Sequence, residues 1–117
     1  ISVFVQYRGG ANLLVGNIGD ELIVLGATNT ISQIYTRGRI SLGGDVNDIV
    51  CVVGNLAFLA TANSGKEFIV VNTNNLDNIT EYASLNFPQV ATGIDFADNK
   101  VFMSVRSNDS LRIITSQ

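Results

Sequence analysis

Histidine and tryptophan are both absent from this 117-residue sequence, which has one cysteine, one methionine and one proline. Without histidine the chain lacks the commonest general base and the usual partner of a catalytic serine or cysteine. Zinc and iron sites built on imidazole ligands are excluded for the same reason. The composition therefore argues against most enzyme mechanisms.

The single cysteine, Cys51, excludes an internal disulfide. It lies inside the apolar run of residues 49–53 (IVCVV), where we interpret it as a small buried core residue. A nucleophilic thiol would need a base beside it, and no histidine can supply one. Cys51 is thus assigned to packing and not to chemistry.

Charge is also scarce: 15% of the residues are charged, the net charge is −3, and no basic run is longer than Arg37-Gly-Arg39. Nucleic-acid binding needs clustered lysine and arginine, so no nucleic-acid partner is expected. No apolar run approaches the roughly 20 residues that span a bilayer, so no membrane span is expected. A hydrophobic share of 46% indicates a folded domain. The start at Ile1, without a signal-peptide pattern, favours a piece of a longer protein over a processed one.

Short apolar segments rich in β-branched and aromatic residues alternate with Gly, Asn and Asp turns, and no window shows a convincing helical period. We therefore predict an all-β chain. The eleven expected strands are Ile1–Arg8, Asn12–Asn17, Glu21–Leu25, Ile31–Ile40, Val46–Val53, Leu56–Ala62, Glu67–Asn72, Ile79–Leu85, Gly93–Ala97, Lys100–Arg106 and Leu111–Thr115. The apolar runs of residues 46–53 and 68–71 predict strands buried on both faces, and the mixed segments 31–40 and 79–85 predict outer strands.

The sequence also repeats. At a spacing of 44 residues, apolar residues fall on apolar residues and turns on turns; the pairs are Val50/Ile94, Val52/Phe96, Asn55/Asn99, Phe58/Phe102, Leu59/Met103, Ile69/Ile113 and Val70/Ile114. A weaker copy lies 46 residues earlier, with the pairs Leu13/Leu59, Asn17/Asn63, Glu21/Glu67, Ile23/Ile69 and Val24/Val70. A period near 40–45 residues with four short strands per unit is typical of β-propeller blades. We predict three blade-like units in one repeat domain, at about residues 1–43, 44–88 and 89–117, the last one strand short.

Residues 54–85 resemble the LVIVD-type propeller repeat: Gly54-Asn55 in a turn, Phe58 and Ala60 in a strand, then the apolar strand Phe68–Asn72. The second copy fits from Asp98-Asn99 to Ile113-Ile114, whereas Asn72 and Leu76-Asp77 depart from the family pattern, which has Asp and Pro there. The resemblance implies a propeller fold and an extracytoplasmic or cell-surface location in bacteria or archaea, including the heads of pilin-like proteins. It is uninformative about activity.

Three blades do not close a ring, because propellers take four to eight. The predicted fold is therefore a partial ring or a fragment of a larger propeller, completed by further blades or by a homo-oligomer such as two chains forming six blades. Ile1–Arg8 could also complete the last blade, in its own chain or in a neighbour. A single β-sandwich is a third option that the chain length permits.

Propeller sites gather where loops of several blades meet. The expected binding candidates are Asp45, Asp48, Asn63, Lys66 and Arg106, in or beside loops at one end of the blades. Oxygen-bearing segments 45–48 and 95–99 are interpreted as turn caps and not as calcium loops, which need six to eight oxygens. Arg37 and Arg39 are expected on one face of their strand.

These patterns predict a non-catalytic propeller scaffold or binding module of a surface protein, mediating protein or ligand interaction, with no catalytic residues, metal or cofactor. The alternative is a portion of a propeller enzyme, a lyase or hydrolase, whose catalytic residues lie in blades outside this chain.

Overall fold

The computed structural model describes residues 2–7, 11–16, 19–27 and 34–116, with side chains from residue 13 onward except at residues 27 and 53. The described chain is all-β, as predicted, with eleven strands and no helix. The strands are β1 (Ser2–Tyr7), β2 (Ala11–Gly16), β3 (Glu21–Ala27), β4 (Ile34–Ser41), β5 (Val46–Val53), β6 (Leu56–Thr61), β7 (Phe68–Asn72), β8 (Thr80–Leu85), β9 (Ala91–Ala97), β10 (Lys100–Val105) and β11 (Leu111–Thr115). Ile1, Arg8, Asn17 and residues 31–33, which the expected strands include, lie outside the described residues. A membrane-crossing helix, long and apolar, is not found among the residues that the structure describes.

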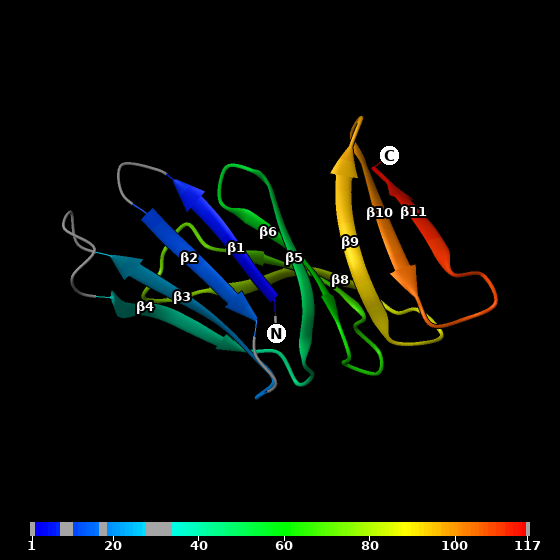
Figure 1. Cartoon of the computed structure of the whole chain (residues 1–117), viewed down its shortest axis with the longest axis horizontal. Helices are drawn as coiled ribbons and strands as arrows, with labels where there is room; N and C mark the ends of the chain where they lie inside the picture. Colours follow the sequence, from blue (N-terminus) through cyan, green and yellow to red (C-terminus); the bar gives the residue numbers. More distant parts are fainter. Residues whose placement is uncertain (1, 8–10, 17–18, 28–33, 117) are drawn as a thin grey trace.

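The strands form three antiparallel sheets in chain order, which we call sheet I (β1-β2-β3-β4), sheet II (β5-β6-β7-β8) and sheet III (β9-β10-β11). Figure 1 shows them side by side along the longest dimension of a 47 × 30 × 21 Å molecule. The first strands of the sheets are neighbours, since β5 contacts both β1 and β9. The described strands form three separate sheets and no closed ring.

Sheets II and III each have a backward face, toward the preceding sheet in the chain, and sheets I and II each have a forward face, toward the following sheet. The same two names are used for the equivalent outer faces of sheets I and III. In sheet II both faces are covered. Ile69 and Val71 of β7 point backward into a core shared with sheet I, whereas Phe68 and Val70 point forward into a core shared with sheet III. Because side chains alternate along a strand, a strand between two cores needs an apolar residue at every position. This explains the uninterrupted apolar run of β7.

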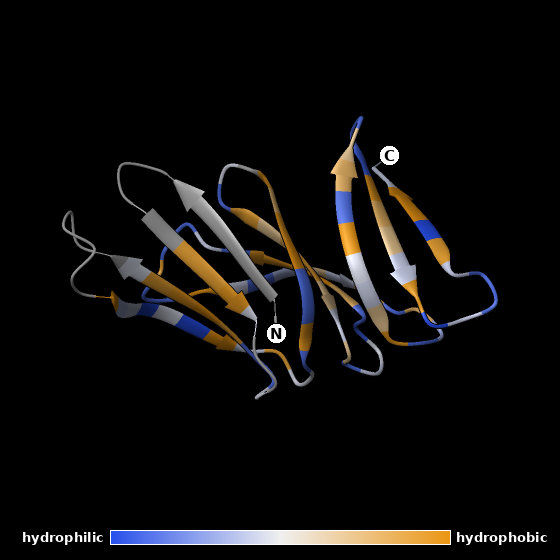
Figure 2. Cartoon of the chain, viewed as in Figure 1, coloured by the Kyte–Doolittle hydropathy of each residue, from blue (hydrophilic) through white to orange (hydrophobic). Residues whose placement is uncertain are grey.

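The fourth strands of sheets I and II are outer strands, as predicted. Most residues of β4 and β8 are exposed, including Ile34 (62%), Tyr35 (50%) and Tyr82 (66%). In Figure 2 hydrophilic blue bands interrupt β4. The expectation for β5 was only partly right. Val46 and Ile49 are buried, but Val50, Cys51 and Val52 keep partial exposure at the end of the strand.

Strand register confirms the likeness of sheets II and III and corrects its spacing. Tight turns at residues 54–55 and 98–99 connect β5 to β6 and β9 to β10, so β6 and β10 correspond at 44 residues, as predicted. In the first strands the spacing is 45, because Val52 is an extra bulged residue between Cys51 and Val53. Val50 and Ile94, which were expected to correspond, therefore lie on opposite faces, and Ile49 is the true counterpart of Ile94. Likewise Cys51, and not Val52, corresponds to Phe96.

In the third strands the spacing is 43, because the loop after β10 is one residue shorter than the loop after β6. Phe58 pairs with Val70, and Phe102 pairs with Ile113. Val70 therefore corresponds to Ile113, and the expected pairs Ile69/Ile113 and Val70/Ile114 are each wrong by one residue. Since side chains alternate, that single residue decides which face they occupy.

Bulges and turn hydrogen bonds recur at corresponding places. Asn47 is a bulged residue in β5 and Thr92 in β9, and Arg37 is bulged in β4 as Tyr82 is in β8. The amide of Thr61 donates to the Glu67 carbonyl, as that of Val105 does to the Ser110 carbonyl, both at 2.8 Å. Such shared irregularities support a true repeat, because chance similarity of strand spacing would not reproduce them.

Sheet I corresponds to sheet II with different spacings in different strands. The bulge positions align β3 with β7 at 46 residues, so Glu21/Glu67, Ile23/Ile69 and Val24/Val70 correspond as expected. Register then aligns β2 with β6 at 44 residues, so Val15, and not Leu13, is the counterpart of Leu59. The proposal that residues 1–8 complete the last blade of their own chain is wrong for residues 2–7, because β1 pairs with β2 in sheet I.

Candidate functional site

The loops that lead into the first strands meet the loops between the second and third strands at one end of the sheets. In sheet II the Ala62 amide donates to the Asp45 carbonyl at 2.9 Å, and in sheet III the Arg106 amide donates to the Val90 carbonyl at 3.0 Å. The loops that carry the sequence-predicted candidates thus share an end within each sheet. The side chains of these candidate residues, however, contact different partners.

Asp48 connects two sheets. Its Oδ1 accepts a hydrogen bond from the Ile49 amide and its Oδ2 accepts one from the Ile94 amide of β9, both at 2.9 Å. The neighbouring Asn47 donates from Nδ2 to the Ala91 carbonyl at 2.7 Å. Both carboxylate oxygens of Asp48 are therefore engaged with backbone, and the residue holds β9 against β5.

Asn63 joins the β6–β7 loop of sheet II to the connection between β4 of sheet I and β5 of sheet II. Its Nδ2 donates to the Leu42 carbonyl at 2.6 Å, and its backbone lies against Gly44 so closely that a Cβ at that position would collide with the Asn63 amide nitrogen. Asp45 contributes its backbone carbonyl to the same contact region. Asn63 and Asp45 thus act as structural links.

Lys66 and Arg106 are the exposed members of the predicted set. Lys66 Nζ lies 3.1 Å from both carboxylate oxygens of Glu81 in β8. The hydrogen bond of Arg106 to Val90 uses the backbone. Both residues are therefore solvent-exposed at the loop end, with Lys66 engaged by Glu81.

Glu67 was missed by the sequence analysis as a site residue. Only 4% of it is exposed, and its two oxygens accept hydrogen bonds from the amides of Gly65 (3.1 Å) and Phe87 (2.8 Å). It lines a shallow hollow of about 430 Å³ together with Ser64, Asn86 and Pro88. The correspondence of Glu21 and Glu67 was the one sequence signal, but both oxygens of Glu67 are used to join the β6–β7 and β8–β9 loops.

Arg37 and Arg39 do not share a face of β4, contrary to expectation. The bulge at Arg37 breaks the alternation, so the Arg37 stem lies beside Gly26 on the forward side, whereas Arg39 is opposite Ile23 on the backward side. Arg39 Nη1 lies 3.7 Å from Glu21 Oε1. Arg37 lines a polar hollow of about 410 Å³ with Asn55 and the loop of residues 73–77.

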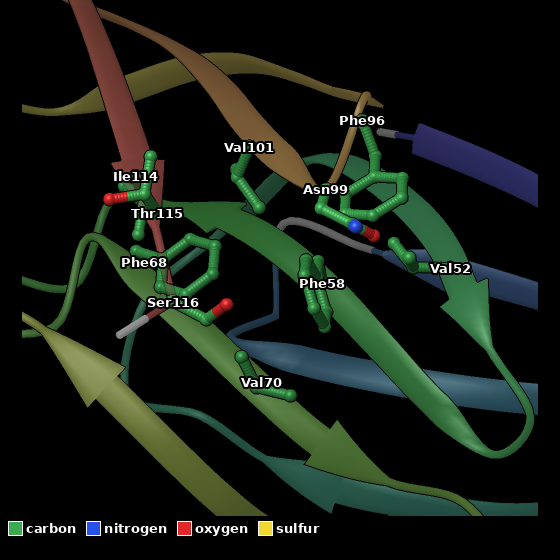
Figure 3. Close-up of a pocket in the computed structure, with 10 residues that line it drawn as sticks. All are labelled: Val52, Phe58, Phe68, Val70, Phe96, Asn99, Val101, Ile114, Thr115 and Ser116. Atoms are coloured by element: carbon green, nitrogen blue, oxygen red, sulfur yellow. The ribbon is translucent and has the colours of Figure 1, made fainter.

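A third candidate is an apolar crevice of about 300 Å³ between sheets II and III. Figure 3 shows side chains of both sheets around it. Its lining consists of Val52, Phe58, Phe68, Val70, Phe96, Asn99, Val101, Ile114, Thr115 and Ser116. The Phe58 ring makes edge-to-face contacts with Phe68 (centroids 5.6 Å apart) and Phe96 (6.2 Å), which fix the shape of the crevice. An apolar side chain or ligand group fits this chemistry.

Metal and thiol chemistry find little support in the described part of the chain. No three of its Cys, Asp or Glu residues gather as metal ligands would. Burial raises the pKa of the Cys51 thiol to about 11, so at neutral pH it is protonated and a poor nucleophile.

The three places differ in what they offer. The loop end presents two exposed cations, the Arg37 hollow presents polar groups, and the crevice presents an apolar cavity with aromatic walls. A scan against models of known protein families found no match for this chain, and a search of curated proteins found none. Its own geometry therefore carries the functional proposal.

Proposed function

We propose that this chain is a non-catalytic β-propeller scaffold, in which sheets I, II and III are consecutive blades that bind a protein or ligand partner. The observation that carries the proposal is the covering of sheet II on both faces by its chain neighbours. A blade buries its two apolar faces only by stacking on neighbouring blades. The backward face of sheet I and the forward face of sheet III carry counterparts of the residues that sheet II buries. These two faces therefore suggest how further blades would be added.

The forward face of sheet III carries apolar residues that are more exposed than their counterparts. Leu111 (61% exposed) and Ile113 (55%) correspond to Phe68 and Val70, each 5% exposed. Phe102 of the same face corresponds to Phe58. The face is less apolar than that of sheet II, because Asp95 and Ser104 stand where sheet II has Val50 and Ala60.

The backward face of sheet I is the surface that would pack against the forward face of sheet III. Leu13, Val15, Ile23 and Leu25 are partly exposed there. Their counterparts in sheet II are Ala57, Leu59, Ile69 and Val71, each 0% exposed in the core between sheets I and II. By this repeat, the forward face of sheet III fits the backward face of sheet I, which makes a head-to-tail contact between two chains geometrically consistent.

We propose further that two chains close a six-bladed ring through these faces, and that the protein works at the cell surface, as the resemblance to LVIVD-type repeats implies. A role without catalysis is supported by the engagement of Asp48 and Glu67, whose oxygens accept backbone amides, and of Glu81, which pairs with Lys66.

Light scattering coupled to gel filtration tests the ring. We expect twice the mass of one chain, and electron micrographs of closed rings. Ile113→Asp, which places a charge on the forward face of sheet III, should yield the single-chain mass. Tyr82→Asp is the matched control, since it charges another exposed large side chain, on β8 (66% exposed against 55% for Ile113), and should leave the dimer intact. A wild-type chain that stays single at high concentration would rule out closure by a second copy.

A further inference from the structure

The polar hollow between sheets I and II has a volume of about 410 Å³. Its walls come from three segments that are distant in sequence: Arg37 of β4, Asn55 in the turn between β5 and β6, and residues 73–77 between β7 and β8. Sites for small molecules commonly have volumes of about 300–1,000 Å³. The hollow is therefore large enough for a small ligand, and polar groups of both sheets surround it.

The loop of residues 73–77 is held in place on two sides. Buried Thr73 donates hydrogen bonds from its amide (2.7 Å) and its Oγ1 (2.8 Å) to the Asn55 carbonyl. Leu76 packs against the core between sheets I and II, and its carbonyl lies so near Gly38 of β4 that a Cβ there would collide with it. A wall fixed by such contacts loses little conformational freedom when a ligand binds, which lowers the entropic cost of binding.

The amide side chains of this loop are oriented by their oxygens. Asn74 Oδ1 accepts a hydrogen bond from Asn55 Nδ2 at 3.0 Å, and Asn75 Oδ1 accepts one from the Asp77 amide at 3.1 Å. Within the described part of the chain, the Nδ2 groups of Asn74 and Asn75 donate to no protein group. Two oriented hydrogen-bond donors are thus left for a ligand.

The hollow also has one group of each charge. Arg37 contributes a guanidinium, which only donates hydrogen bonds, and Asp77 contributes an exposed carboxylate, which only accepts them. An anion would be attracted by Arg37 and repelled by Asp77, and a cation would meet the reverse. A neutral ligand with hydroxyl groups suits both, because a hydroxyl donates one hydrogen bond and accepts others. The charges therefore favour a neutral, polyhydroxylated ligand.

An aromatic ring lies next to Arg37. Tyr35 Cζ and Arg37 Cγ are both within 3.0 Å of the point that a Cβ on Gly26 would occupy, so the ring and the Arg37 stem share the space above that glycine. Half of Tyr35 is exposed. The electron-rich face of an aromatic ring attracts weakly positive C–H groups, which a sugar presents on the faces of its ring. An exposed ring beside oriented polar groups fits the two kinds of surface that a sugar has.

We propose that the hollow between sheets I and II is a binding site for a neutral carbohydrate. Asn74, Asn75 and Arg37 donate to hydroxyl oxygens, Asp77 accepts from a hydroxyl group, and Tyr35 covers one face of a sugar ring. The guanidinium has five N–H donors, so Arg37 can contact a sugar and a protein group together. The inference rests on the proposed role as a binding scaffold and names its class of ligand, but it does not depend on ring closure.

Nuclear magnetic resonance titration of the full, isotopically labelled chain tests the site. The probes are cellobiose, maltose and lactose, each raised to about 20 mM so that a millimolar Kd is detected. We expect saturable shifts of the Asn74 and Asn75 side-chain amide resonances with at least one of these sugars. Glycerol, which has hydroxyl groups but no ring, and acetate, an anion, should give no saturable shift. A response to acetate alone, or to none of the sugars, would overturn the proposal.

Variants at the two ends of the site separate ligand contacts from structural ones. Asp77→Ala removes an exposed carboxylate, and Tyr35→Ala removes an exposed ring. Each should raise the Kd of the best sugar about tenfold without lowering the urea midpoint, whereas Tyr35→Phe, which keeps the ring, should bind like wild type.

Asp109→Ala and Tyr82→Ala are the matched controls, since they truncate exposed residues of the same types on other segments. Sugar binding that survives both Asp77→Ala and Tyr35→Ala, or that the controls weaken equally, would contradict the site.

The carbohydrate site and the ring fail separately. A chain that remains single and binds sugar in the hollow refutes closure by a second copy and leaves the carbohydrate site standing. A closed dimer whose resonances respond to none of the sugars refutes the site and leaves the proposed scaffold standing.

Discussion

Truncation of Val70 and of its counterpart Ile113 tests whether the forward face of sheet II is buried while that of sheet III is exposed. Val70→Ala removes two methyl groups from a side chain that is 5% exposed. At about 0.8 kcal/mol per buried methyl-sized group, plus the cavity left behind, the expected loss of unfolding free energy is about 2–3 kcal/mol. Ile113→Ala removes three carbons, but 55% of that residue is already exposed, so a loss under about 1 kcal/mol is expected.

Urea titration of dilute protein, followed by far-ultraviolet circular dichroism, measures both values. With a slope of about 1.5 kcal/mol per molar urea for a domain of this size, Val70→Ala should lower the midpoint by roughly 1.3–2 M and Ile113→Ala by less than about 0.7 M. The larger deletion should therefore cost less. Equal losses in single chains would refute the assignment of the two faces, whereas a loss at Ile113 that grows with protein concentration would show that a second chain covers it.

Asp48→Ala should destabilise by about 1–3 kcal/mol, because it leaves the Ile94 amide without its carboxylate; the Ile94 amide resonance should shift, and an unchanged resonance would contradict the link. Glu67→Gln should cost a similar amount in urea titrations, since an amide donor then faces one of two backbone amides. Asn99→Val should cost about 1–2 kcal/mol and Asn99→Gly little, because φ is +58° at this position; similar midpoints would contradict the turn. Burial raises the pKa of Cys51 from 9.0 to about 11, so iodoacetamide at pH 8 should label the folded chain far more slowly than the urea-unfolded chain.

The same pKa gives a pH dependence of stability. Below pH 9 the Cys51 thiol is protonated in both states and its burial costs no ionisation energy. Between pH 9 and about 11 the unfolded chain gains thiolate while the folded chain stays protonated, so stability should decline across that window. Cys51→Ala should flatten this part of the curve when unfolding midpoints are compared at pH 8 and 10.5.

Strand positions were predictable because turn residues and apolar segments determine local structure from neighbouring residues alone. Residues 54–55 and 98–99 were expected as tight turns, and φ is positive at Gly54, Asp98 and Asn99, as such turns require. The outer character of β4 and β8 followed from their mixed composition. The apolar run of β7 indicated burial on both faces, which the two cores confirm.

Details that depend on single-residue register were not predictable. A fixed spacing of 44 cannot place Val52 or Arg37 in bulges, because each bulge is defined by the pairing with a neighbouring strand. The candidate site failed for a related reason. Asp48 and Asn63 are the residue types that fill loops and bind ligands, but the structure directs their polar atoms to backbone groups of β9 and Leu42. The hydrogen-bond partner of a polar side chain depends on tertiary packing, which the local sequence pattern does not specify.

The bulge at Val52 has a consequence for how repeated sheets of this kind tolerate changes of length. In a strand of period two, an inserted residue exchanges inside for outside along everything beyond it. Here the extra residue is pushed out of the ladder next to the turn, so Ile49 and Cys51 stay on the backward face, as Ile94 and Phe96 do in a strand without it. The bulge works as a phase corrector. Single-residue insertions and deletions can therefore accumulate in the repeats while the same strand positions still face the two cores. The repeats then remain more alike in structure than in sequence.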